Sequence, residues 1–135
     1  MSGSTLAIGS SLLDTNIVIA LFAHDTAVAQ RLEQAASVFV PGTVIGELYF
    51  GAYNSARVEQ NVARVTEFAA SSAVLWIDAT TAQYYGQLKA ELRTLGHPLP
   101  ENDVWIAALA RQFSLTLVSR DAHFKAVPDL AVEAW

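Results

Sequence analysis

The sequence predicts an α/β fold, a three-layer α/β/α sandwich with a central, mostly parallel sheet. Its 135 residues suit a single domain built around one hydrophobic core. Hydrophobic residues make up 53% of the chain and charged residues only 16%, a balance typical of strands that are buried on both faces. Short apolar runs alternate with helical patterns along the chain, and this alternation predicts right-handed crossovers between parallel strands.

Five short apolar segments predict the strands. The first ends at Leu12-Leu13, and the last, at the edge of the sheet, is "LAVEAW" at residues 130–135. The three between them are "SVFVP" (37–41), "AVLWID" (73–78) and "SLTLVS" (114–119). None of them exceeds six residues, which is an ordinary strand length.

Helical periodicity fills most of the intervening chain. Gly96 ends one helix, the loop "GHPLP" follows it, and Asp78 is most simply the cap of the helix after the third strand. We find no repeat and no domain boundary, so residues 1–135 form one domain, with the Gly/Ser-rich residues 1–10 as a loose extension. The predicted helices cover residues 16–22, 26–36, 42–54, 57–70, 81–96 and 101–113.

Composition excludes several classes of protein. The longest purely apolar run, Ile17 to Ala23, falls far short of the ~18 residues that indicate a membrane-spanning helix. The first ten residues lack the Lys or Arg of a secretory signal, so we expect a cytoplasmic protein that does not enter the membrane. Without cysteine, the chain has no disulfide framework, thiol nucleophile or thiolate metal site.

The charge of the chain argues against gripping nucleic acid by electrostatics alone. The net charge is -5, and the eight Lys and Arg residues are scattered. Phosphate contacts need concentrated cations. Any function on nucleic acid must therefore offset this shortage of clustered positive charge.

Four acids, far apart in sequence, are predicted to meet at one edge of the sheet. Asp14 follows the first strand directly, and Asp121 follows the fourth by two residues. Glu47 lies early in the helix after the second strand, and Asp103 lies in the first turn of the helix that leads back to the fourth. In a parallel sheet, the carboxyl ends of the strands and the starts of the following helices share one edge.

Each of these acids also has a structural explanation, which is weakest for Glu47 because its apolar, glycine-containing helix offers little reason for one acid. Asp14 and Asp121 could cap helical turns, and Asp103 could favour the positive end of its helix. Asp103, however, lies on the helix face of Ile106, Ala107 and Ala110, where a merely solvating charge is out of place. Coincidence of all four acids at one rim is less probable than any single structural explanation.

A cluster of carboxylates requires cations or raised pKa values. Two carboxylates ~4 Å apart repel by about 4 kcal/mol at an effective dielectric constant near 20. Oxygen donors, without cysteine and without paired histidines, favour Mg²⁺ or Mn²⁺ over Zn²⁺. Asn16, two residues after Asp14, could hold a water molecule of such an ion.

Four segments resemble, in order, the four motifs of PIN domains: "LLDTNIVIAL", "VIGELYFGA", "ENDVWIAALA" and "LVSRDAHF". The chain looks most like the VapC-type toxins of bacterial toxin–antitoxin pairs. The resemblance spans roughly Leu12 to Trp135, almost the whole chain, and four ordered acidic motifs are far more specific than any one of them.

The resemblance implies a Mg²⁺- or Mn²⁺-dependent endoribonuclease, and it implies RNA rather than DNA as substrate. It also implies a homodimer and a cognate antitoxin whose tail enters the acidic groove. One departure is His123, which stands where many members carry a further acid, and it leaves the metal count open. The positions that match the family are Asp14, Glu47, Asp103 and Asp121 for the acidic cluster and metal, with Asn16 and Ser119 as supporting polar residues.

Arg120, beside Asp121, is a candidate phosphate contact, and a surface salt bridge explains it equally well.

Three alternative interpretations of the chain stay open. A haloacid-dehalogenase-like phosphatase needs a second aspartate where this chain has Asn16. A receiver-like signalling module needs paired acids and a late lysine, but Ser119-Arg120 occupies the expected lysine position. A PIN-like module that binds partners without cutting is the third alternative.

Overall fold

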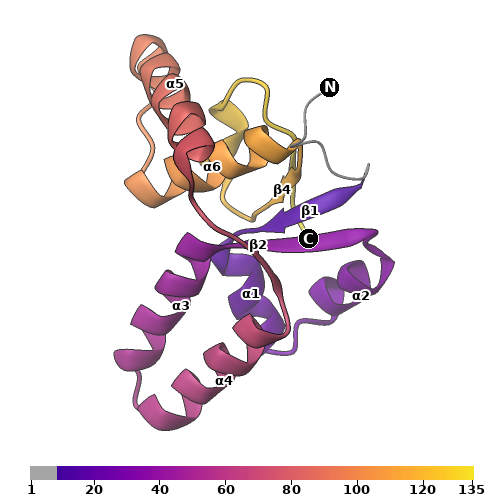
Figure 1. The fold of residues 1–135 in the computed structure, drawn as a ribbon. Helices are drawn as coiled ribbons and strands as arrows, with labels where there is room; N and C mark the ends of the chain where they lie inside the picture. The colour runs from indigo at the N-terminus through magenta and orange to yellow at the C-terminus, as the bar shows by residue number, and fades with distance from the viewer. Residues whose placement is uncertain (1–8) are drawn as a thin grey trace.

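In the described part of the chain, the sheet has five strands in the order β3-β2-β1-β4-β5. The computed structural model describes residues 9–135 (Figure 1). Each neighbouring pair of strands is parallel, as predicted. The strands are β1 (Ser10–Leu13), β2 (Ser37–Pro41), β3 (Ala73–Leu75), β4 (Thr116–Val118) and β5 (Val132–Glu133).

Within residues 9–135, six α-helices flank this sheet and confirm the three-layer architecture. In Figure 1, the first four helices lie below β1 and β2, and the last two pack together above them. No helix in the described part of the chain is long and apolar enough to cross a membrane. The helices are α1 (Thr15–Phe22), α2 (Thr26–Gln34), α3 (Gly42–Tyr53), α4 (Val58–Ala70), α5 (Ala79–Leu95) and α6 (Glu101–Phe113), followed by the 3₁₀ helix η1 (Ala122–Ala126).

The core is centred on β1, whose four residues are all buried. Leu12 pairs with Phe39 on one side and with Leu117 on the other, so it is enclosed by strands as well as by helices. Burying one such leucine contributes roughly 1.5–3 kcal/mol. In α6 the run from Ile106 to Ala110 is buried without interruption, which makes this helix the most enclosed one. Both β1 and α6 are therefore rigid supports for any side chain at their ends.

Some predicted boundaries were wrong. The third strand ends at Leu75 rather than at residue 78, and Trp76 leaves the sheet with 66% of its surface exposed. Asp78 caps α5, as predicted. The fourth strand is also shorter than predicted, because Ser114 caps α6 in a left-handed conformation. Ser10 belongs to β1, so the expected extension ends before it, and residues 1–8 lie outside the described part.

The strand order places a topological switch point between β1 and β4. From β1 the chain proceeds to β2 and β3 on one side, and it then returns to β4 on the other side of β1. At such a point, the loops that follow the two neighbouring strands run in opposite directions and leave a crevice, where open α/β sheets bind ligands. The residues after β1 and β4 are Asp14 and Ser119 to Asp121.

Candidate active site

Asp14 is both a helix cap and a member of the crevice. Its Oδ1 accepts a hydrogen bond from the Thr15 amide at 2.8 Å, which makes it the N-cap of α1. Its Oδ2 accepts a second hydrogen bond from Ser119 Oγ at 2.7 Å, and its own amide donates to the Val118 carbonyl at 3.0 Å. Asp14 is only 6% exposed. The two explanations that the sequence left open for Asp14 are therefore compatible.

Asn16 and Ser119, the predicted supporting residues, tie the loops after β1 and β4 together. Asn16 Nδ2 lies 3.4 Å from both Asp14 Oδ2 and Ser119 Oγ, and Asn16 Oδ1 accepts from the Arg120 amide at 3.2 Å. Ser119 Oγ also accepts from the Asp121 amide at 3.0 Å. These bonds fix the position of Asp14 relative to Asp121.

Glu47 extends toward the same crevice from α3. Thr15 Oγ1 donates a hydrogen bond of 2.8 Å to Glu47 Oε1 and so links α1 to α3. Burial raises the pKa of Glu47, and the nearby charges of Asp14 and Asp103 raise it further, against the opposing effect of the Thr15 bond. The sequence reasoning missed Thr15, although a hydroxyl directly after the first acid was a signal.

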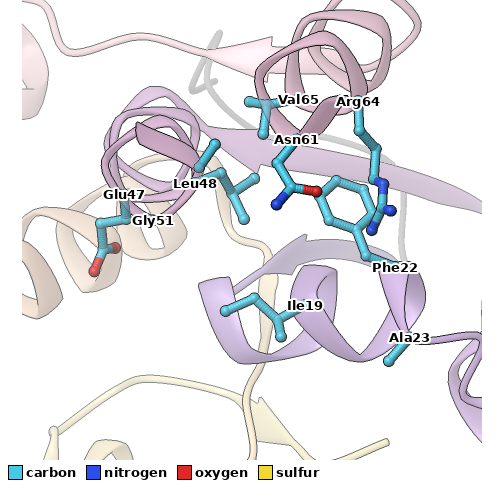
Figure 2. Close-up of a pocket in the computed structure, with 10 residues that line it drawn as sticks. Ile19, Phe22, Ala23, Glu47, Leu48, Gly51, Asn61, Arg64 and Val65 are labelled. Atoms are coloured by element: carbon cyan, nitrogen blue, oxygen red, sulfur yellow. The ribbon is translucent and has the colours of Figure 1, made fainter. Parts of the chain in front are cut away.

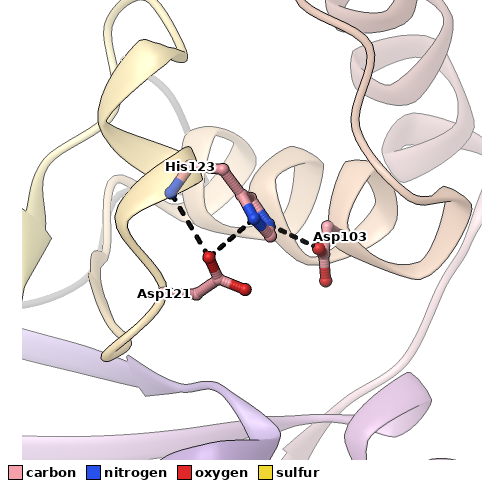
Figure 3. Close-up of side chains that lie close together, drawn as sticks. All are labelled: Asp103, Asp121 and His123. Carbon is pink, nitrogen blue, oxygen red and sulfur yellow. Dashed lines mark hydrogen bonds and ion pairs between the residues drawn. The ribbon is translucent and has the colours of Figure 1, made fainter.

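Asp103, His123 and Asp121 form a contiguous group (Figure 3). His123 Nε2 lies 2.7 Å from Asp103 Oδ2, and His123 Nδ1 lies 2.6 Å from Asp121 Oδ1. The side chain of Asp103 is 17% exposed. Its burial raises its pKa, the His123 hydrogen bond lowers it, and the Asp14 and Asp121 charges raise it. The prediction that Asp103 points inward is confirmed.

This acidic rim, defined as Asp14, Glu47, Asp103, Asp121 and His123, suits a divalent cation. One donor atom from each of Asp103, Asp121 and His123 falls within 4.8 Å of the others. Asp14 and Glu47 lie outside that tight group, but their charges act on its members or on each other. Since burial and the neighbouring acids raise the pKa values of Glu47 and Asp103, a bound cation would make their ionised forms more favourable. The residues therefore fit a metal.

Arg120 makes an ion pair at the surface in this structure. Its Nη2 lies 2.8 Å from Asp25 Oδ2, and its Nε donates to the Trp135 carbonyl oxygen at 2.8 Å. The Arg120 hydrogen bond lowers the pKa of Asp25. The salt-bridge explanation thus describes its position, and the phosphate contact stays a prediction.

An apolar cleft adjoins the rim (Figure 2). It has a volume of about 380 Å³ and lies between α1, α3 and α4. Phe22, Leu48 and Val65 contribute apolar walls, and Glu47 and Arg64 are its charged lining residues. Glu47 therefore belongs both to the rim and to the cleft.

Comparison with known proteins identifies the class. The PIN domain model matches residues 11–130, which include every residue of the acidic rim. The chain belongs to the PIN-domain family.

Within that family its relatives are VapC proteins. The chain is 36% identical over 127 residues to ribonuclease VapC2 of Haemophilus influenzae, covering 92% of this chain and 96% of the relative. It is 33% identical, with the same coverage, to the tRNA(fMet)-specific endonuclease VapC of Shigella flexneri. The crystal structure of VapBC2 from Rickettsia felis, bound to a DNA fragment from their promoter, matches with a TM-score of 0.87 and 30% identity. That match covers 93% of this chain and 98% of the solved one.

Proposed function

We propose that the protein is a metal-dependent endoribonuclease of the VapC type, the toxin of a toxin–antitoxin pair. The observation that carries this proposal is the gathering of Asp14, Glu47, Asp103 and Asp121 around the switch point of the sheet. Relatives at 33–36% identity over 92% of this chain are ribonucleases or endonucleases by name. The gathering supplies the chemistry such an activity requires.

Mg²⁺ or Mn²⁺ is the ion we propose, held by Asp14, Asp103 and Asp121 with Glu47. Such an ion supplies Lewis acidity, which activates water and stabilises charge on a phosphodiester. Asp14 contributes a carboxylate that two protein hydrogen bonds hold in place. Glu47, held by the Thr15 hydroxyl at the edge of the rim, is the candidate acceptor of the proton that the attacking water loses. Water attacks phosphorus, the P–O bond to the leaving nucleotide breaks, and no covalent enzyme intermediate forms.

The proposed partners are RNA, a second copy of the chain and a cognate antitoxin. A bound cation would offset the acidic rim and so reduce the charge deficit of the chain toward RNA. The apolar cleft next to Glu47 suits an antitoxin segment that packs apolar side chains beside α1 and α3 and directs a cationic one toward the rim. Solved relatives are complexes of VapB with VapC. The compartment that this function requires is the cytoplasm, where RNA is present.

Incubation of the purified protein with pooled cellular RNA tests this function. Reactions contain Mg²⁺, Mn²⁺ or EDTA, and the Asp14→Asn variant runs in parallel. Asparagine caps a helix as well as aspartate does, so this variant should fold while losing a metal ligand. We expect discrete cleavage in either ion, none in EDTA and none by the variant.

The opposite result selects a different function. If wild type and variant leave the same RNA pattern in all three buffers, the nuclease proposal is wrong. The non-catalytic PIN-like module then becomes the best account. Assay of the same samples with a small phosphomonoester tests the phosphatase alternative, and assay with acetyl phosphate tests the receiver-like one.

A further inference from the structure

We propose that His123 is itself a ligand of the metal, through Nε2, and that it shifts the preference of the site from Mg²⁺ toward Mn²⁺. This inference rests on the proposed function, because it concerns the same ion. It differs from the ligand set above by adding a nitrogen donor to a carboxylate cluster.

The position of the ring supports this inference. In Figure 3 the imidazole lies between two carboxylates, with Nδ1 2.6 Å from Asp121 Oδ1 and Nε2 2.7 Å from Asp103 Oδ2. A neutral imidazole carries a single N–H, so it can donate to only one of them. Its other nitrogen then directs a lone pair at a carboxylate oxygen. Two lone pairs at such a distance repel each other unless a cation lies there, either a second ring proton or a metal ion, and a metal ion bound at the rim competes with that proton for the nitrogen.

Local geometry selects the nitrogen that faces the metal. Asp121 and His123 belong to the same tight turn, and the His123 backbone amide also donates to Asp121 Oδ1 at 3.3 Å. The Nδ1 contact is therefore built into the turn, and Phe124, which is fully buried, anchors that turn in the core. Nε2 faces a carboxylate from a separate element, α6. An imidazole that donates one N–H to a carboxylate and offers its other nitrogen to a metal is the usual arrangement of histidine ligands.

The spacing of the donors fits one ion. Two neighbouring donors that each lie ~2.1 Å from an octahedral ion are roughly 3 Å apart. Nε2 and Asp103 Oδ2 are separated by 2.7 Å, close to that spacing, and both would bind one ion once the carboxylate turned off the axis of the ring nitrogen. Asp121 lies within 4.8 Å of the other two groups and holds the opposite side of the ring through Nδ1.

The nature of the donor then decides the ion. Mg²⁺ selects oxygen ligands and demands near-ideal octahedral geometry, whereas imidazole nitrogen suits transition metals. Mn²⁺ accepts both kinds of ligand. A site with a histidine among aspartates should therefore bind Mn²⁺ in preference to Mg²⁺ by a wider margin than a site of carboxylates alone.

Electron paramagnetic resonance of Mn²⁺ tests the ligand directly, without any assay of activity. Mn²⁺ is titrated into the wild type and into His123→Asp, and pulsed spectra of the bound ion are recorded for coupling to ¹⁴N. The chain has only three histidines. We expect nitrogen coupling in the wild type, its retention in the control His97→Asn, and its loss in His123→Asp. Competition with Mg²⁺ should show the Mn²⁺ preference falling about tenfold or more in His123→Asp.

The outcomes separate this inference from the proposed function. If the wild type binds Mn²⁺ without nitrogen coupling, or if His123→Asp keeps both the coupling and the preference, His123 is not a ligand and the nuclease proposal stands. If the wild type binds no Mn²⁺ at all, both the ligand and the metal-dependent mechanism are wrong. Should His123→Asp fail to fold, His123→Asn replaces it, and the wild-type spectrum alone still decides whether nitrogen binds.

Discussion

Asp78 and Asp103 are both aspartates at the start of a helix, and their surroundings differ in kind. Asp78 completes a capping box: its Oδ1 accepts from the Thr81 amide at 2.9 Å, and its own amide donates to Thr81 Oγ1 at 3.2 Å. The Thr81 amide and the Thr81 hydroxyl both donate to the Asp78 carboxylate, and these two hydrogen bonds lower its pKa. Asp103 has its pKa raised, first by burial, and two further acids act on it in the same direction.

The difference teaches how a structural acid is distinguished from one placed for chemistry. Asp78 is exposed and has its charge satisfied by the helix that it begins, so it stabilises the fold by itself. Asp103 is part of a site that the fold must support, since its burial and the charges of Asp14 and Asp121 oppose its ionisation. Sequence position alone makes the two look alike.

The largest expected effect separates these two aspartates by activity. Asp103→Asn should reduce RNA cleavage by roughly 10³-fold or more, because a ligand to an ion worth several kcal/mol is lost. The matched control Asp78→Asn keeps a good cap and should cleave within about twofold of wild type. Initial rates on one defined RNA measure both. Equal losses in the two variants would remove the distinction.

The second effect is on stability, and here Asp78 is the residue whose loss matters. Asp78→Ala removes the cap of α5 and should lower the thermal unfolding midpoint by about 2–6 °C, with cleavage at low temperature retained. Differential scanning calorimetry gives the midpoint. An unchanged midpoint would mean that the capping box contributes nothing to stability.

A smaller effect, a gain in stability, is expected when the charge of Glu47 is removed from the rim. Glu47→Gln keeps the shape of the side chain and the acceptor for Thr15 but removes a charge whose ionisation burial opposes, so without divalent ions the midpoint should rise by about 2–4 °C. Activity should fall at the same time. Calorimetry in EDTA and in Mn²⁺ tests this, and the gain should shrink when Mn²⁺ offsets the wild-type charge. A midpoint below that of wild type in EDTA contradicts the account.

The smallest effect is a pH dependence of stability, whose sign differs between the acidic rim and the Asp78 cap. Glu47 and Asp103 have raised pKa values, so above their ordinary values of 4.5 and 3.8 the native state binds more protons than the unfolded state. Their contribution to the free energy of unfolding therefore falls as the pH rises from these ordinary pKa values through the raised ones. Asp78 has a lowered pKa, so its contribution is lost only as pH falls below 3.8. Urea unfolding of wild type, Glu47→Gln and Asp78→Asn across pH 3 to 7 checks both signs. A slope above pH 4.5 that persists unchanged in Glu47→Gln excludes Glu47 as its source.

Much of this architecture could be predicted, because local patterns determine it. α6 spans Glu101–Phe113 as expected, since Pro100 precedes it and its apolar face is continuous. The convergence of Asp14 and Asp121 followed from the rule that parallel strands end at one edge. Both depended on periodicity and topology, which a sequence carries.

The rest depended on contacts between distant residues. Trp76 and Ile77 look like strand residues, but β3 ends before them and leaves both exposed. The Trp76 ring lies against Gly42 of α3, where only a glycine leaves room for it, since a Cβ there would come within 2.3 Å of the ring. The Thr15 bond to Glu47 and the position of His123 between two acids required coordinates, because neither follows from spacing along the chain.

The pairing of β1 with β4 has a consequence for synthesis on the ribosome. Asp14 is made early, yet Ser119, which binds its Oδ2, is made 105 residues later. A nascent chain that stops before β4 lacks one wall of the crevice and one of its acids, so it cannot assemble the rim whatever else has folded. A cell that makes such a protein is thus exposed to the assembled rim only after translation has passed Asp121.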